Sequence, residues 1–280
     1  MQERVREFQF TRDDFNFLRK VTNRRTGIAV GEDKADMVYS RLSRRVRKLG
    51  LRDFSEYCEL IRRDGSDCEV LELINSITTN LTSFFRENHH FEYLKQQLLP
   101  ELIERNRRTR RIDIWSAGCS TGEEPYSIAI CLREVLRNIE SWQVRLLASD
   151  IDSAVLAQAA SAVYSDDRIE DMAQLRLQRW FQRGRGGNSG LVRLKSEVRE
   201  MVEFQRINLM DSWAFDAPVD VIFCRNVVIY FDKHTKERLI NRYADALRDG
   251  GYLFIGHSES LFTVTDRFEL IGNTVYRKRD

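Results

Sequence analysis

A glycine-containing loop with two adjacent glutamates is the first place in the chain where residue types and spacing indicate ligand binding. The loop covers residues 116–127, has the sequence SAGCSTGEEPYS and follows a short apolar segment. Gly118 and Gly122 permit a tight turn, and the small side chains leave room for a ligand. Glu123 and Glu124 suit the start of a helix but oppose a phosphate there. The loop therefore favours a cationic ligand without phosphates, although a strand-to-helix turn capped by glutamates would use the same residues.

A further acid, Asp150, ends the apolar segment VRLLASD. A carboxylate at the end of a strand is well placed to accept hydrogen bonds from both hydroxyls of a ribose. A solvated aspartate at a strand end is the alternative interpretation. Together with the preceding loop, Asp150 favours a ligand such as S-adenosylmethionine, which combines a ribose with a sulfonium and an ammonium group.

Alternating strands and helices must position these loops. From Arg111 onward, short apolar segments such as RIDIWSAG, VRLLASD, DVIFCRNVVIYF and GYLFIGH alternate with amphipathic helices. This alternation, with near-continuous apolar strands, predicts a doubly wound parallel sheet covered on both faces. The interval 184–206 has a glycine-rich turn and short alternating segments, and we interpret it as a small antiparallel β insertion. We therefore expect an α/β domain over residues 91–280.

Residues 1–90 are predicted to form a separate, all-helical domain. In the segment 36–49, the apolar residues Val38, Leu42, Val46 and Leu49 share one stripe at helical spacing. The other side of that helix carries a basic face, consisting of Arg41, Arg44, Arg45 and Lys48. This face could steer an acidic partner toward the site, but charge runs are commonly solvated helix faces, and RNA is another possible partner.

Bulk composition is ordinary for a globular protein. The chain has 280 residues, of which 42% are hydrophobic and 31% charged. The longest apolar runs fall short of the ~18–20 residues that cross a bilayer, and the first residues do not resemble a signal peptide, so we expect a cytoplasmic protein without membrane insertion. The five cysteines form no CxxC pair, and the four histidines fall in no recognisable metal-binding motif. We therefore expect reduced thiols and no metal.

Five motifs in a fixed order connect the chain with a known family. The segments TNLTSFFRENHHF, SAGCSTGEEPYSIAI, ASDID, IFCRNVVIYFDK and GGYLFIGHSESL resemble the CheR family of chemotaxis receptor glutamate O-methyltransferases. The resemblance runs from about residue 10 to the end of the chain. It implies a class I methyltransferase (Rossmann-like) fold, S-adenosylmethionine as methyl donor, S-adenosylhomocysteine as product and receptor glutamates as substrate. The GxGxG pattern common in methyltransferases is replaced here by AGCSTG, so only the family-specific motif supports the prediction.

The resemblance also implies which residues bind the donor. These are Asn80, Thr82, Arg86, Glu124, Asp150, Asn208, Leu209, Arg225 and Asn226. Arg86 and Tyr230 are candidate catalytic residues, because a guanidinium can orient a carboxylate bidentately and a phenol can line the site. The alternatives are a surface charge for Arg86 and a core aromatic for Tyr230.

Methylation of a carboxylate does not require the enzyme to remove a proton from the acceptor. Glutamate has a reference pKa of about 4.3, so at neutral pH it is already ionised and needs no general base. Enzymes that methylate nitrogen often have a proline-containing turn after the fourth strand, whereas this chain has CRNVVIYF. Nitrogen methylation of RNA or protein therefore remains a second hypothesis, and a non-catalytic module that binds S-adenosylmethionine is a third.

Two partner surfaces follow from the resemblance. The basic face suits the glutamate-rich, cytoplasmic methylation helices of chemoreceptors, in preference to nucleic acid. In related enzymes the β insertion can bind the receptor's C-terminal tail peptide by adding a strand to a sheet edge. The glycine-rich segment containing Gly186 and Gly190 resembles that form, and a hairpin turn is the best interpretation of its sequence.

Overall fold

The chain divides into two compact units in the computed structural model, which describes residues 6–63 and 67–279. One unit comprises Met1–Thr79 and Tyr230–Thr235, and the other comprises Asn80–Ile229 and Lys236–Asp280. Within the described residues, we find no helix that is both long enough and apolar enough to span a membrane. The division falls at Thr79, before the boundary expected at residue 90.

Side-chain contacts explain where the division falls. The Asn80 amide donates to Asp152 (2.9 Å), and the Phe84 ring packs edge-on against Tyr164 and Phe181. The residues that follow Thr79 therefore belong to the α/β unit, although they precede its first strand.

The helical unit is built from α1 (Arg12–Thr26), α2 (Ala35–Lys48), α3 (Phe54–Arg62) and α4 (Asp67–Ile77), with the short 3-10 helix η1 (Glu32–Lys34). Thr11 and Asp14 form a reciprocal capping box at the start of α1, and Gly27 ends that helix in the left-handed conformation. The Ala29 N–H donates to the Tyr230 carbonyl (2.8 Å). This bond explains why Tyr230–Thr235 belongs to the helical unit.

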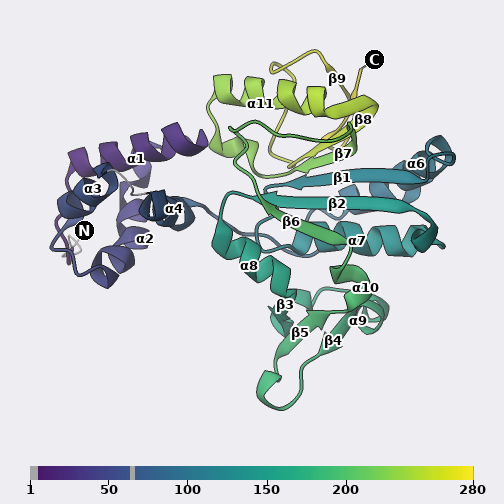
Figure 1. The fold of residues 1–280 in the computed structure, drawn as a ribbon, viewed down its shortest axis with the longest axis horizontal. Coiled ribbons are helices and arrows are strands. Elements are labelled where there is room, and N and C mark those ends of the chain that lie inside the picture. Colours follow the sequence, from purple (N-terminus) through teal and green to yellow (C-terminus); the bar gives the residue numbers. More distant parts are fainter. Residues whose placement is uncertain (1–5, 64–66, 280) are drawn as a thin grey trace. The chain divides into compact units, whose positions relative to one another are not determined.

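The α/β unit contains a seven-stranded sheet in the order β6-β2-β1-β7-β8-β10-β9. Neighbouring strands from β6 to β8 run parallel (Figure 1). Strand β10 is antiparallel to both of its neighbours. The bounds are β1 (Arg111–Ala117), β2 (Gln143–Asp150), β6 (Val202–Arg206), β7 (Val219–Cys224), β8 (Leu247–Ile255), β9 (Phe268–Gly272) and β10 (Val275–Lys278). The parallel part of the sheet directs the ends of β1, β2, β6, β7 and β8 to one edge.

Helices cover both faces of this sheet. Figure 1 shows α11 on one side and α7 with α8 on the other. The helices are α5 (His89–Tyr93), the π-helical turn η2 (Leu94–Leu98), α6 (Leu99–Arg105), α7 (Glu123–Val135), α8 (Ser153–Ser161), α9 (Gln174–Trp180), α10 (Ser196–Arg199) and α11 (Lys233–Ala246). The expected class I, doubly wound architecture is confirmed.

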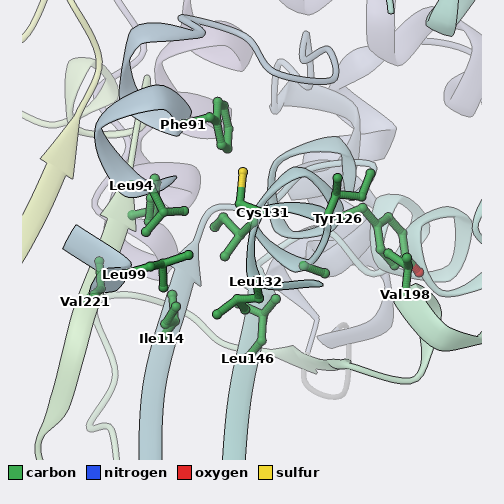
Figure 2. Close-up of a cluster of buried hydrophobic side chains, with 14 of the residues drawn as sticks. Phe91, Leu94, Leu99, Ile114, Tyr126, Cys131, Leu132, Leu146, Val198 and Val221 are labelled. Carbon is green, nitrogen blue, oxygen red and sulfur yellow. The ribbon is translucent and has the colours of Figure 1, made fainter. Parts of the chain in front are cut away.

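A large apolar core packs α5, η2 and α7 against the sheet. Figure 2 shows part of it, with Phe91 and Leu94 on the helical side and Ile114, Leu146 and Val221 on the strands. All five side chains are buried, and burying each contributes roughly 1.5–3 kcal/mol. The core thereby fixes the carboxyl edge of the sheet, where the predicted ligand loops begin.

An ion-pair cluster also anchors α7. Glu134 accepts from Lys95 (2.6 Å) and from Arg176 (2.8 Å), and its side chain is 16% exposed. Burial opposes ionisation of this carboxyl, but the hydrogen bonds from the two cations outweigh burial and lower the pKa of Glu134 to about 2. Glu134 therefore ties α7 to η2 and α9.

The small antiparallel sheet differs in extent from the expected insertion. Its order is β3 (Val163–Ser165), β5 (Leu191–Leu194) and β4 (Phe181–Arg183). The end of the predicted interval, β6 at Val202–Arg206, instead pairs parallel with β2 as an edge strand of the main sheet. Short alternating sequences suit an exposed edge strand as well as a hairpin, and only the pairing partner separates the two.

Candidate active site

The loop after β1 adopts the tight turn that its glycines predict. Gly118 and Gly122 have φ angles of +90° and +96°, in the region that favours glycine. A side chain would also collide with Val227 at the first position and with Ala159 at the second. The Gly118 N–H donates to the Ser149 carbonyl (2.8 Å), so the loop is fastened to the end of β2.

Asp150 lies at the end of β2 beside this loop. Its Oδ2 accepts the Ser120 N–H (2.8 Å), its Oδ1 accepts the Asp152 N–H (3.0 Å), and the residue is 8% exposed. Burial raises the pKa of Asp150, against the lowering effect of these backbone donors. Two backbone bonds therefore hold the carboxylate in one orientation.

The two glutamates that begin α7 have different partners. The buried Glu123 pairs with Arg168, which also donates to the Thr82 carbonyl (2.9 Å). Glu124 instead accepts from Ser116 (2.7 Å) and from Arg225 (3.2 Å). Neither glutamate is a simple exposed helix cap. Burial raises the pKa of Glu124, and the positive charge of Arg225 opposes that effect.

Arg225 joins the end of β7 to the segment before α5. Its side chain is 2% exposed, pairs with both Glu124 and Glu87, and donates to the carbonyl of Arg86. The Arg86 guanidinium donates to the Leu81 carbonyl (2.8 Å). Three residues that are predicted to bind the methyl donor are therefore linked in one network, namely Arg86, Glu124 and Arg225.

Of the other residues predicted to bind the methyl donor, all but Thr82 lie at strand ends or contact them, and the Thr82 carbonyl accepts from Arg168 (2.9 Å). The Asn80 carbonyl accepts from Ser120 (3.0 Å), which places Asn80 against the loop after β1. Asn208 and Leu209 follow β6, and the neighbouring Ile207 N–H donates to the Asp150 carbonyl (3.1 Å). Arg225 and Asn226 follow β7.

Glu259 organises the loop after β7, although the sequence alone suggested no role for it. It is 4% exposed, and its carboxylate accepts the N–H groups of Gly256 (2.5 Å), Asn226 (3.1 Å) and Ile229 (3.2 Å). Asn226 has a φ of +58°, a conformation that costs energy for a residue other than glycine. Glu259 lies within the motif GGYLFIGHSESL, which was the only signal for it in the sequence.

Tyr230 differs from the other candidates because it belongs to the helical unit, whereas Arg86 belongs to the α/β unit. The Tyr230 hydroxyl donates to the Thr79 carbonyl at 3.5 Å. The side chain is partly exposed, so the alternative of a fully buried core aromatic does not describe it.

The basic face of α2 is not one free surface. Arg41 donates to the carbonyls of Ile77 (2.5 Å) and Thr78 (2.9 Å). Arg45 is 18% exposed and forms a bidentate pair with Glu69 (2.9 and 2.5 Å). These two arginines hold α2 against α4. The other two members of the face, Arg44 and Lys48, are exposed.

The predicted hairpin loop connects β4 with β5. Gly186 and Gly190 have φ angles of +58° and +80°, and both are exposed. The Gly184 N–H donates to the Leu191 carbonyl (2.8 Å) and closes the hairpin. The prediction of a turn here is confirmed.

Comparison with known proteins decides the family. A family model described as "CheR methyltransferase, SAM binding domain" matches residues 80–277, and one described as "CheR methyltransferase, all-alpha domain" matches residues 13–78. The chain belongs to the CheR methyltransferase family. This CheR-family chain is 46% identical to "Chemotaxis protein methyltransferase 2" of Pseudomonas aeruginosa, over 96% of the chain and 94% of that protein. It is 42% identical to "Chemotaxis protein methyltransferase" of Escherichia coli, over 94% of the chain and 89% of that protein.

Membership confirms three predictions made from the motifs. The CheR-family chain is an enzyme, it transfers methyl groups, and S-adenosylmethionine is its donor. The boundary between the two family models coincides with the division between the two structural units at Thr79.

Proposed function

We propose that this enzyme transfers the methyl group of S-adenosylmethionine to glutamate side chains of chemoreceptors, forming glutamate methyl esters. The observation that carries the proposal is Asp150, a buried carboxylate fixed by two backbone N–H groups at the carboxyl edge of a CheR-family sheet. A carboxylate has about four lone-pair positions, so Asp150 can accept ribose hydroxyls in addition to these two bonds.

The acidic character of the loop after β1 fits the same donor. S-adenosylmethionine supplies an electrophilic methyl group on a positively charged sulfur. Asp150 contributes negative charge at that site, which disfavours a phosphate there. The charge of Glu124 is already paired with that of Arg225. Asn80, Thr82, Asn208, Leu209 and Asn226 complete the donor pocket in this proposal.

Arg225 and Arg86 have separate tasks in the proposal. The charge of Arg225 is offset by Glu87 and Glu124, and this arrangement keeps the end of β7 in place. Arg86 has five N–H donors, and one of them goes to Leu81. Its other donors can orient the acceptor carboxylate bidentately. A catalytic role for Tyr230 stays a prediction from the sequence.

The reaction then requires no acid or base. A carboxylate oxygen of the acceptor forms a bond to the methyl carbon, the carbon–sulfur bond breaks, and its electron pair stays on sulfur. The products are a methyl ester and S-adenosylhomocysteine, and no proton moves. The task of the protein is therefore to orient the acceptor and exclude water.

We assign the binding of the receptor to two surfaces, one on each unit. We propose that the exposed Arg44 and Lys48 attract the acidic, cytoplasmic methylation helices of a receptor, because charge complementarity accelerates association. The strand edges of the β3-β5-β4 sheet, next to the loop with Gly186 and Gly190, can bind a receptor tail peptide by strand addition. Both partners place the enzyme in the cytoplasm.

The test is a labelling experiment with receptor-enriched membranes and tritiated S-adenosylmethionine. We expect label in the receptor band that is released by mild base, as a methyl ester requires. Base-stable label would contradict the ester and favour nitrogen methylation, and RNase-sensitive label would favour RNA. Donor binding without labelling of any receptor would favour a non-catalytic module. Repeating the assay with receptors lacking their last residues tests the tail peptide separately.

A further inference from the structure

A cluster of one carboxylate and two imidazoles lies at the start of α5. Glu87, His89 and His90 bring one potential ligand atom each to within 4.8 Å of the others. The spacing of these residues matches no recognisable metal-binding motif, so the sequence by itself predicts no metal here. The tertiary structure adds information that spacing lacks, namely which ring nitrogen of His90 is available.

The tautomer of His90 follows from one hydrogen bond. Its Nε2 lies 2.7 Å from the carbonyl oxygen of Asn273. A carbonyl can only accept, so Nε2 carries a proton, and in the neutral ring Nδ1 then presents a lone pair. His90 is fully buried, and its Nδ1 has no hydrogen-bond partner within residues 6–63 and 67–279. A buried lone pair without a partner is energetically costly.

This lone pair faces another acceptor. His90 Nδ1 lies 3.6 Å from Glu87 Oε2. Zn²⁺ binds histidine nitrogen and carboxylate oxygen at about 2.0–2.1 Å, and tetrahedral geometry then separates two ligand atoms by roughly 3.3–3.4 Å. The observed separation is close to that value, so a single metal ion can bridge the two atoms with little movement.

Neighbouring groups orient the Glu87 carboxylate for this task. His257 donates to it through Nδ1 (2.9 Å, to Oε1) and through its backbone N–H (3.2 Å, to Oε2). Such outer contacts are typical of carboxylates that bind metals. Arg225 lies 3.4 Å from Oε2, and its positive charge opposes a cation. Arg225 also pairs with Glu124, so two carboxylates face this single guanidinium.

We propose that Glu87, His89 and His90 form a binding site for a divalent transition-metal ion with the preferences of Zn²⁺. Two imidazole nitrogens and one carboxylate oxygen suit Zn²⁺, Co²⁺ or Ni²⁺ better than Mg²⁺ or Ca²⁺, which prefer oxygen ligands. The three protein ligands leave the fourth position of a tetrahedral ion open. The site is distinct from the residues proposed to bind the donor, although Glu87 contacts one of them.

The test uses Co²⁺ as a spectroscopic probe, with the full chain first treated with a chelator. We expect one equivalent of Co²⁺ to produce visible absorption bands of a four- or five-coordinate ion, and Zn²⁺ to displace it. His89→Ala removes a ligand from an exposed residue, so the fold should survive and the affinity should fall by roughly 100-fold or more. His257→Ala should reduce the affinity about 10- to 100-fold, the range measured for outer contacts.

The matched control is His234→Ala, which removes an exposed histidine that is neither one of the three proposed ligands nor the outer contact His257. We expect it to bind Co²⁺ like the wild type. The proposal is overturned if the wild type shows no such bands, or if His89→Ala retains wild-type affinity while remaining folded by circular dichroism. Loss of binding in His234→Ala alone would also overturn it, by assigning the ion to another surface.

Discussion

Replacing Asp150 by asparagine tests the proposed ribose contact most directly. Asparagine keeps the shape of the side chain but replaces one acceptor oxygen with an NH₂ group and removes the charge. A hydrogen bond to a charged group contributes about 1.5–3 kcal/mol. Since 1.36 kcal/mol corresponds to a factor of ten, Asp150→Asn should raise the dissociation constant of the donor by roughly 10- to 150-fold.

The structure requires a control for indirect damage. Asp150 also accepts the N–H groups of Ser120 and Asp152, so the substitution can loosen the loop after β1. Calorimetry should therefore compare S-adenosylhomocysteine with an analogue that lacks one ribose hydroxyl. The wild type should bind the analogue about tenfold or more weakly, whereas Asp150→Asn should discriminate little between the two ligands.

This pair of ligands separates the two explanations. Damage to the loop would weaken the binding of both ligands by the same factor and leave the ratio of their dissociation constants unchanged. Asp216→Asn, at a side chain that is 92% exposed, serves as the matched control and should behave like the wild type. Equal discrimination in wild type and Asp150→Asn would refute the ribose contact.

Three further predictions concern stability and partner binding. Glu259→Gln should lower the free energy of unfolding by about 1–3 kcal/mol and weaken donor binding, because a buried backbone N–H loses its acceptor; unchanged urea unfolding and calorimetry would contradict this. Glu134 has its pKa lowered from 4.5 to about 2, so its ionic form stabilises the fold by about 3 kcal/mol above pH 4.5, and this contribution is lost as the pH falls toward 2. The free energy of unfolding in urea should therefore differ most between Glu134→Gln and the wild type at neutral pH, and the difference should vanish on acidification. A difference that does not change with pH would exclude this role of the Glu134 charge. Reversing the charge of Arg44 and Lys48 should spare donor binding and slow receptor methylation, with a smaller effect at high salt; equal rates at low salt would remove these residues from the partner surface.

Local sequence determined much of the α/β unit. Apolar segments that end in small or acidic residues correctly predicted the positions of β1 and β2. The two glycines of the loop after β1 correctly predicted a tight turn with positive φ angles, where a side chain would be strained. The order of five motifs determined the family. These features depend on residues close together in the chain, where dihedral preferences and hydrophobic periodicity act directly.

Tertiary structure alone decided which partner each polar group takes. Arg45 and Arg44 both belong to the predicted basic face, yet the first is paired with Glu69 and the second is exposed. Likewise, the alternating segment at Val202–Arg206 could be a hairpin or an edge strand until its pairing with β2 was known.

The same limit applies to the network around Glu87, Arg225 and Glu259. Their partners come from positions far apart in the chain, and charge and burial depend on what packs around each group in three dimensions. Short-range sequence pattern therefore determined the elements and the loops that they present, whereas long-range packing determined the electrostatic environment of the side chains on those loops, because desolvation and ion pairing act through space rather than along the chain.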